Sequence, residues 1–139
     1  MTAVDTNVLV RLLTADDPKQ SAAAKALFAA GPIWIAKTVL LETAWVLRGL
    51  YRFDDSAIHA ALIKLLGLKN VQAEDEAAVA RALTLNAHGI DLADAMHLTS
   101  RAPGAVFVSF DRRFVRRATR AGANDVSEVA AHPRRANPK

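Results

Sequence analysis

AVFVSFDRRFVRRATRA, residues 105–121, holds the clearest strand of the chain and the helix that follows it. Its first six residues are apolar except for one serine, and they have the length of a buried strand. Asp111 ends this run, and residues 112–121 have the charge and spacing of a basic helix. Strand, carboxylate and helix in this order predict an α/β unit with Asp111 at the carboxyl end of the strand.

The same order occurs at the start of the chain. Val4 and its neighbours form a short apolar run that ends at Asp5, and residues 7–14 have helical spacing. The further strands are expected at residues 33–36, 70–73 and 125–129, and the further helices at residues 17–30, 38–51, 54–66, 75–88 and 91–101. Short apolar strands that alternate with helices predict a parallel sheet covered on both faces.

The composition indicates one folded domain. The chain has 139 residues, 52% of them hydrophobic, and no cysteine, which excludes disulfides and Cys-based zinc sites. It has neither a signal peptide nor an apolar run of the roughly 18 residues that a membrane helix needs, so we expect a cytoplasmic protein with no membrane contact. Residues 1–131 are expected to form the domain, and residues 132–139 a basic, flexible tail.

The positive charge is concentrated toward the end of the chain. Residues 101–139 hold nine of the 18 Lys and Arg residues and three of the 14 acids, in a chain of net charge +4. Two interpretations stay open here. The arginines are either a solvated helix face followed by a tail, or a surface that contacts the phosphate groups of a polyanion.

Four carboxylates interrupt apolar stretches, and these are Asp5, Glu42, Asp94 and Asp111. A buried carboxylate without a partner costs several kcal/mol, and four at one point repel one another unless a divalent cation holds them. Asp5 and Asp111 end strands, whereas Asp94 and Glu42 lie in the first turns of helices, so all four can lean toward one sheet edge. Oxygen-only ligands of this kind suit Mg²⁺ or Mn²⁺.

Each carboxylate also has a simpler explanation. Asp111 and Asp5 could cap the helices that follow them, and Asp94 could be a first-turn acid stabilised by the helix dipole. Asp91 is a better cap candidate for that helix than Asp94. Glu42 is the hardest to explain structurally, because its neighbours are nearly all apolar. Taken singly these explanations are the simpler ones, but together they account poorly for four such placements.

Four stretches, VDTNVLVR (4–11), LET (41–43), DLADA (91–95) and SFDRRF (109–114), make the chain resemble the PIN-domain family of metal-dependent ribonucleases. Within that family it looks most like the VapC toxins of bacterial toxin–antitoxin pairs. The resemblance implies a three-layer α/β/α sandwich with a central parallel sheet, Mg²⁺ or Mn²⁺ at the four acids, and RNA as substrate. It also implies a homodimer and a dedicated antitoxin protein that binds the toxin.

The expected reaction is hydrolysis that leaves a 5′-phosphate and a 3′-hydroxyl, with one or two metal ions. Asp5, Glu42 and Asp94 are the expected metal ligands, and Asp111 would bind directly or through water. Thr6 would orient water or substrate. The residues expected to contact RNA phosphates form a stripe at helical spacing, namely Arg113, Arg116, Arg117 and Arg120.

Three other functions fit the residues of this chain less well. A haloacid-dehalogenase-like phosphatase needs a second aspartate two residues after the first, where this chain has Asn7. A receiver-type phosphoacceptor needs an acidic pair before its first strand and a late lysine, and neither is evident. A catalytically silent PIN fold that binds only RNA or a protein partner is the main alternative, although the intact acids argue against it.

The expected homodimer also has a basis in the residues. The helix expected at 38–51 is apolar nearly all round, and a helix with two apolar sides needs cover on both. One side can face the sheet, and the other would form an exposed patch typical of an interface. An antitoxin would be expected to pair an apolar helix with an Arg or Lys that enters the acidic pocket.

Overall fold

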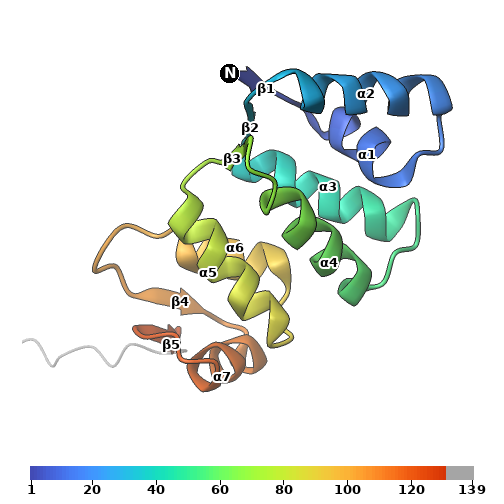
Figure 1. Ribbon diagram of the computed structural model, residues 1–139. Coiled ribbons are helices and arrows are strands. Elements are labelled where there is room, and N and C mark those ends of the chain that lie inside the picture. The colour runs from blue at the N-terminus through green and yellow to red at the C-terminus, as the bar shows by residue number, and fades with distance from the viewer. Residues whose placement is uncertain (131–139) are drawn as a thin grey trace, which may run out of the picture.

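The structure is a computed structural model that describes residues 1–130 (Figure 1). Its strands are β1 (Thr2–Ala3), β2 (Ile33–Ile35), β3 (Val71–Ala73), β4 (Phe107–Ser109) and β5 (Val126–Glu128). Its helices are α1 (Thr6–Thr14), α2 (Pro18–Ala30), α3 (Lys37–Gly49), α4 (Asp55–Leu66), α5 (Glu76–Ala87), α6 (Leu92–Thr99) and α7 (Arg112–Arg120). All the predicted strands and helices are present, most of them slightly shorter than expected.

Aspartate side chains begin nearly all of these helices. In six of the seven helices in residues 1–130, the aspartate before the helix accepts a hydrogen bond from a backbone N–H of the first turn. Such a bond satisfies one of the donors that a helix leaves free at its start. The capping residues are Asp5, Asp17, Asp54, Asp75, Asp91 and Asp111.

The helix α3 starts differently, because no side chain next to it in the sequence caps it. The helix follows Ala36, whose side chain cannot cap it, and Thr38 already lies inside the first turn. The backbone N–H of Lys37 donates instead to Glu74 Oε1 at 3.0 Å. A carboxylate 37 residues away along the chain therefore does what a local side chain does at the other helices.

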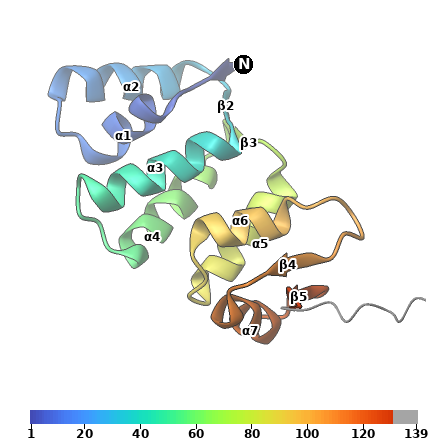
Figure 2. The ribbon, with the colours of Figure 1, turned by 180° about the vertical axis from the view of Figure 1, so that it is seen from behind.

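The predicted α/β fold with parallel strands is confirmed, and the strands form two sheets. β1, β2 and β3 are hydrogen-bonded in that order, β4 pairs with β5, and every pairing is parallel. From behind, α1 and α2 lie at one end of the molecule, and α7 lies with β4 and β5 at the other (Figure 2). The central parallel sheet thus has three strands, and β4 and β5 form a second parallel sheet of two strands.

The second sheet is covered on one face only. Phe107 of β4 packs edge-on against Phe114 of α7, with ring centroids 5.7 Å apart. Val106, Val108 and Phe110 remain 59%, 54% and 79% exposed. The prediction that helices cover both faces of the strands is wrong for β4, and an apolar surface is left open beside the start of α7.

The helix α3 lies in the middle of the fold and packs against α1, α4 and α6. Leu40 and Leu47 on this helix are fully buried in the hydrophobic core. Trp45 and Leu50 remain 73% and 77% exposed. One side of this helix is thus packed into the core, and the exposed Trp45 leaves the expected second apolar side partly open.

Two further expectations concern the ends and the surroundings of the chain. No helix in residues 1–130 is long and apolar enough to cross a membrane. The expected basic tail, residues 132–139, lies outside the described residues, so the domain boundary near residue 131 stays a prediction.

Candidate active site

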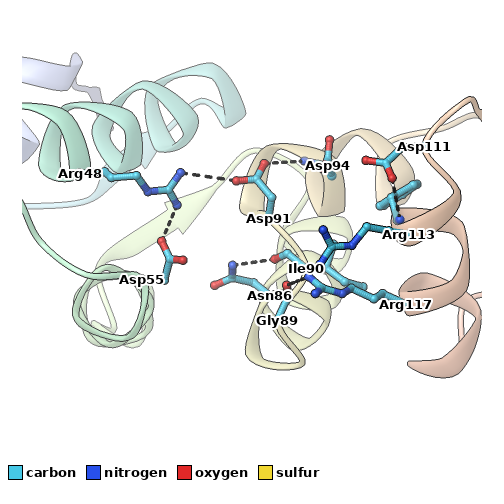
Figure 3. A pocket seen from close by; sticks show the side chains of 11 residues that line it. Arg48, Asp55, Asn86, Gly89, Ile90, Asp91, Asp94, Asp111, Arg113 and Arg117 are labelled. Carbon is cyan, nitrogen blue, oxygen red and sulfur yellow. Dashed lines mark hydrogen bonds and ion pairs between the residues drawn. The ribbon is translucent and has the colours of Figure 1, made fainter.

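A cavity of about 390 Å³ lies between α3, α4, α6 and α7 and is lined by charges of both signs (Figure 3). Its acidic residues are Asp55, Asp91, Asp94 and Asp111, and its basic residues are Arg48, Arg113 and Arg117. Two of the four predicted metal ligands, Asp94 and Asp111, therefore lie in one cavity. Two of the four predicted RNA-binding arginines, Arg113 and Arg117, lie there with them.

The first turn of α6 supplies two of these carboxylates. Asp91 Oδ2 accepts hydrogen bonds from the backbone N–H groups of Ala93 at 3.1 Å and Asp94 at 3.3 Å, so its expected role as the cap is confirmed. Burial raises the pKa of Asp94, and the negative charges of Asp91 and Asp111 raise it further, while His97 partly opposes them. Asp94 is therefore a half-buried carboxylate that is repelled by the charges of both acidic neighbours.

Asp111 is held at the junction between β4 and α7. Its Oδ1 accepts from the backbone N–H of Phe114 at 3.0 Å, and its own N–H donates to Ser109 Oγ at 3.0 Å. The simpler explanation of Asp111 as a helix cap is thus correct. Because the cap uses one carboxylate oxygen, the other oxygen can still bind a ligand.

The remaining predicted site residues lie elsewhere. Asp5 caps α1 through a bond of 3.1 Å from Val8 N and lines a separate cavity together with Arg11. Thr6 is buried and donates a short hydrogen bond to Glu42 Oε1. Glu42 is exposed, so its apolar neighbours in the sequence do not bury it. The contact joins the start of α1 to α3 and fixes the orientation of the Glu42 carboxylate.

The predicted metal ligands do not line a single cavity. Asp94 and Asp111 line one cavity, Asp5 lines another, and Glu42 lines neither and is held by Thr6. Within residues 1–130, no three His, Asp or Glu side chains are close enough together to hold one metal ion. The chemistry of the oxygen donors suits Mg²⁺ or Mn²⁺, but their spacing in this conformation does not enclose an ion.

The arginines of α7 fall into three kinds. Arg113 and Arg117 line the cavity, where Arg117 donates to the backbone oxygen of Gly89 at 3.5 Å. Arg112 Nε is 2.9 Å from Glu128 Oε1, so its charge is already paired. The other two arginines of the predicted stripe, Arg116 and Arg120, are exposed on the same helix.

Sequence reasoning missed Arg48, Asp55 and Asn86 as cavity residues. Arg48 NH2 lies 2.7 Å from Asp55 Oδ1, and Asn86 Nδ2 donates to the backbone oxygen of Ile90 at 3.0 Å. The only signal for Arg48 is a charge at the end of the apolar part of α3. Six residues separate it from Glu42, which corresponds to roughly 240° around a helix. The two charges therefore point to different sides of α3.

Comparison with known proteins adds one finding to this geometry. A family model described as PIN domain matches residues 2–119, a stretch that reaches from β1 almost to the end of α7. A search of curated proteins finds no match.

Proposed function

The chain belongs to the PIN-domain family, and we propose that it is a metal-dependent endoribonuclease that hydrolyses RNA phosphodiesters. PIN domains are generally nucleases, and PIN nucleases typically use divalent metal ions. The observation that supports the proposal most is the mixed charge of the cavity. Asp94 and Asp111 offer oxygen ligands for a cation, and Arg113 and Arg117 offer guanidinium groups for phosphates beside them.

Asp5, Glu42, Asp94 and Asp111 are the residues proposed to hold Mg²⁺ or Mn²⁺. A divalent ion bound there would supply an activated water and polarise the phosphodiester. The chain's own contacts explain how several ligands keep their positions. Thr6 orients the carboxylate of Glu42, and the cap at Asp111 fixes its direction relative to α7. Thr6 is therefore proposed as a positioning residue.

A titration with Mn²⁺ tests the metal site. A ligand that binds only the folded state raises stability by mass action, by about 2.7 kcal/mol at a hundredfold excess over Kd. We expect Mn²⁺ to raise the melting temperature of the wild type and not that of Asp5→Asn or Asp94→Asn. Asp17→Asn is the matched control, because it removes a carboxylate from another helix start and asparagine still caps. An equal rise in all four proteins would rule out the proposed ligands.

A catalytically silent PIN fold that only binds RNA or a protein partner is the second candidate. The observation that favours it is that Asp5 lines a different cavity from Asp94 and Asp111. This candidate predicts that the protein binds RNA, does not cleave it, and does not gain thermal stability from Mn²⁺. The endoribonuclease is expected to cleave RNA and to be stabilised by Mn²⁺.

The proposed biological role is that of a VapC-like toxin, held in check by an antitoxin protein. This role rests on the family likeness and on the charge of the cavity, which can receive an Arg or Lys from a partner. The antitoxin would pair that cation with an apolar helix. The test is to induce the chain alone in its own host and then together with the neighbouring small reading frame. Equal growth in both cases, with no small protein co-purified, would contradict the role.

A homodimer is proposed as the working assembly. Two large apolar side chains, Trp45 on α3 and Leu50 at its C-terminal end, are exposed to solvent. Large apolar side chains at this exposure are typical of interfaces. We expect light scattering to give a dimer at micromolar concentration and Trp45→Ser to shift it toward the monomer. A wild-type monomer under these conditions would contradict the proposal.

A further inference from the structure

Arg48 faces the cavity from the side opposite α7. Figure 3 shows its side chain entering from α3, with Asp91 between it and the side chains of Arg113 and Arg117. The cavity therefore has guanidinium groups on two walls and carboxylates between them. The family comparison assigns no role to Arg48, and it lies outside the arginine stripe of α7.

The present partners of Arg48 are carboxylates that hold it weakly. Its NH2 atom is 2.7 Å from Asp55 Oδ1, and its NH1 atom is 3.6 Å from Asp91 Oδ1. The Arg48 side chain is 47% exposed and that of Asp55 is 79% exposed. Ion pairs at such exposure contribute little to stability, so the guanidinium can exchange a partner without unfolding the protein. Its five donors also let it bind a phosphate and a carboxylate together.

Four carboxylates in the cavity repel a polyanion, and cations beside them reduce that repulsion. A strand that entered along α7 would meet Arg113 and Arg117 first and then the acids of α6. The next phosphate, beyond the acids, would lie near Arg48. The guanidinium of Arg48 could donate two hydrogen bonds to the oxygens of that phosphate. The RNA strand would then be held on both sides of the reacting bond.

We propose that Arg48 binds an RNA phosphate on the α3 side of the cavity, so that a single strand crosses the cavity from α7 to α3. The inference rests on the proposed function, because it presumes that the cavity acts on RNA. It makes Arg48 the binding residue on the side of the scissile bond opposite to the arginine stripe. The Arg48–Asp55 ion pair would then weaken RNA binding, because Asp55 competes with the phosphate for the same guanidinium.

The pair Arg48→Ala and Asp55→Asn provides the test. Both variants break the same ion pair, but only the first removes the cation. Binding of a labelled single-stranded RNA of mixed sequence is measured in EDTA at several salt concentrations, so that cleavage plays no part. We expect Arg48→Ala to weaken binding to every sequence and to make the slope of log K against log salt shallower by about 0.7, the value for one phosphate on a single strand. Asp55→Asn is expected to bind RNA as tightly as the wild type or more tightly.

The outcomes separate this inference from the function on which it rests. Equal weakening by both variants would mean that the ion pair only positions α3 and α4, and the inference would fail. An unchanged salt slope in Arg48→Ala would also overturn it, while RNA binding by the wild type would leave the proposed function standing. A wild type that binds no RNA would remove both. If Arg48→Ala does not fold, Arg48→Gln keeps a polar side chain without the positive charge and must show the same loss of slope.

Discussion

The two arginines that α7 directs into the cavity allow a quantitative prediction. In Arg113→Ala/Arg117→Ala, two guanidinium groups beside Asp94 and Asp111 are lost. Each phosphate neutralised on a single strand contributes about 0.7 to the slope of log K against log salt, so the slope should become shallower by about 1.4. Between about 50 and 200 mM salt, a fourfold change, the wild type should therefore lose about sevenfold more affinity than the variant.

The assay is fluorescence anisotropy of a labelled single-stranded RNA in EDTA, with the salt concentration varied. Arg81→Ala/Arg112→Ala is the matched control. It also takes the net charge from +4 to +2, but Arg112 is already paired with Glu128, and Arg81 lies on α5 outside the cavity lining. Its slope should change by less than half as much as that of the cavity variant.

Two results would refute this reasoning. If both double variants flatten the slope equally, binding depends on overall charge and not on the cavity. If the cavity variant keeps the wild-type slope, Arg113 and Arg117 are solvated residues, which was the other interpretation of the basic helix.

Three further predictions concern stability. Asp94→Asn should raise the unfolding free energy near pH 7. The reason is that burial and the neighbouring acids raise the pKa of Asp94, so its charged form destabilises the folded state. The gain in stability should vanish as the pH falls through that raised pKa to the ordinary value of 3.8. Thr43→Val should stabilise the protein by about 1–2 kcal/mol in urea unfolding, since the fully buried Thr43 hydroxyl has no hydrogen-bond partner among residues 1–130; a loss of stability would show that the hydroxyl is bonded. Tyr51→Phe removes the hydrogen bond of 2.6 Å to Asp16, which is the largest cause of the lowered pKa of Asp16. The variant should therefore be less stable than the wild type above pH 3.8, and the difference should shrink on acidification. A difference independent of pH would contradict this.

The helices were predictable because their signals are local. Asp17 and Pro18 mark the start of α2, and the sequence placed its end at Ala30, where the structure ends it too. The aspartates before the helices act within three residues of their own positions, so short-range spacing suffices to find them. The partner at the start of α3 could not be found in this way, because the N–H of Lys37 donates to Glu74, which only the tertiary fold brings near.

The arrangement of the strands was not predictable in the same way. The alternation of strands with helices predicted parallel strands, which is correct, but it carries no information on which strands are neighbours. The separation of β4 from the first sheet leaves Val108 and Phe110 exposed, although both lie in an apolar run typical of a buried strand. Strand order is a long-range property, and no residue spacing within one strand reports it.

The candidate site was predictable in part for the same reason. Asp94 and Asp111 could be grouped because a first-turn residue and a strand-end residue can lean toward one sheet edge, and the structure places both in one cavity. Asp5 fits the same rule but lines another cavity, beside Arg11. Arg48 could not be found from spacing, because its direction depends on how α3 is rotated against α4 and α6. The metal roles of the four acids stay predictions.

The chemistry of the RNA ends tests the central claim most directly. The full chain is incubated with RNA in Mg²⁺ or Mn²⁺ and in EDTA, beside Asp94→Asn, and the cleaved ends are sequenced with methods that require a 5′-phosphate. Hydrolysis at a carboxylate-held metal predicts 5′-phosphate and 3′-hydroxyl ends with the wild type and metal, and none in EDTA or with Asp94→Asn. Cleavage that persists in EDTA, or ends that carry a 5′-hydroxyl, would contradict the claim.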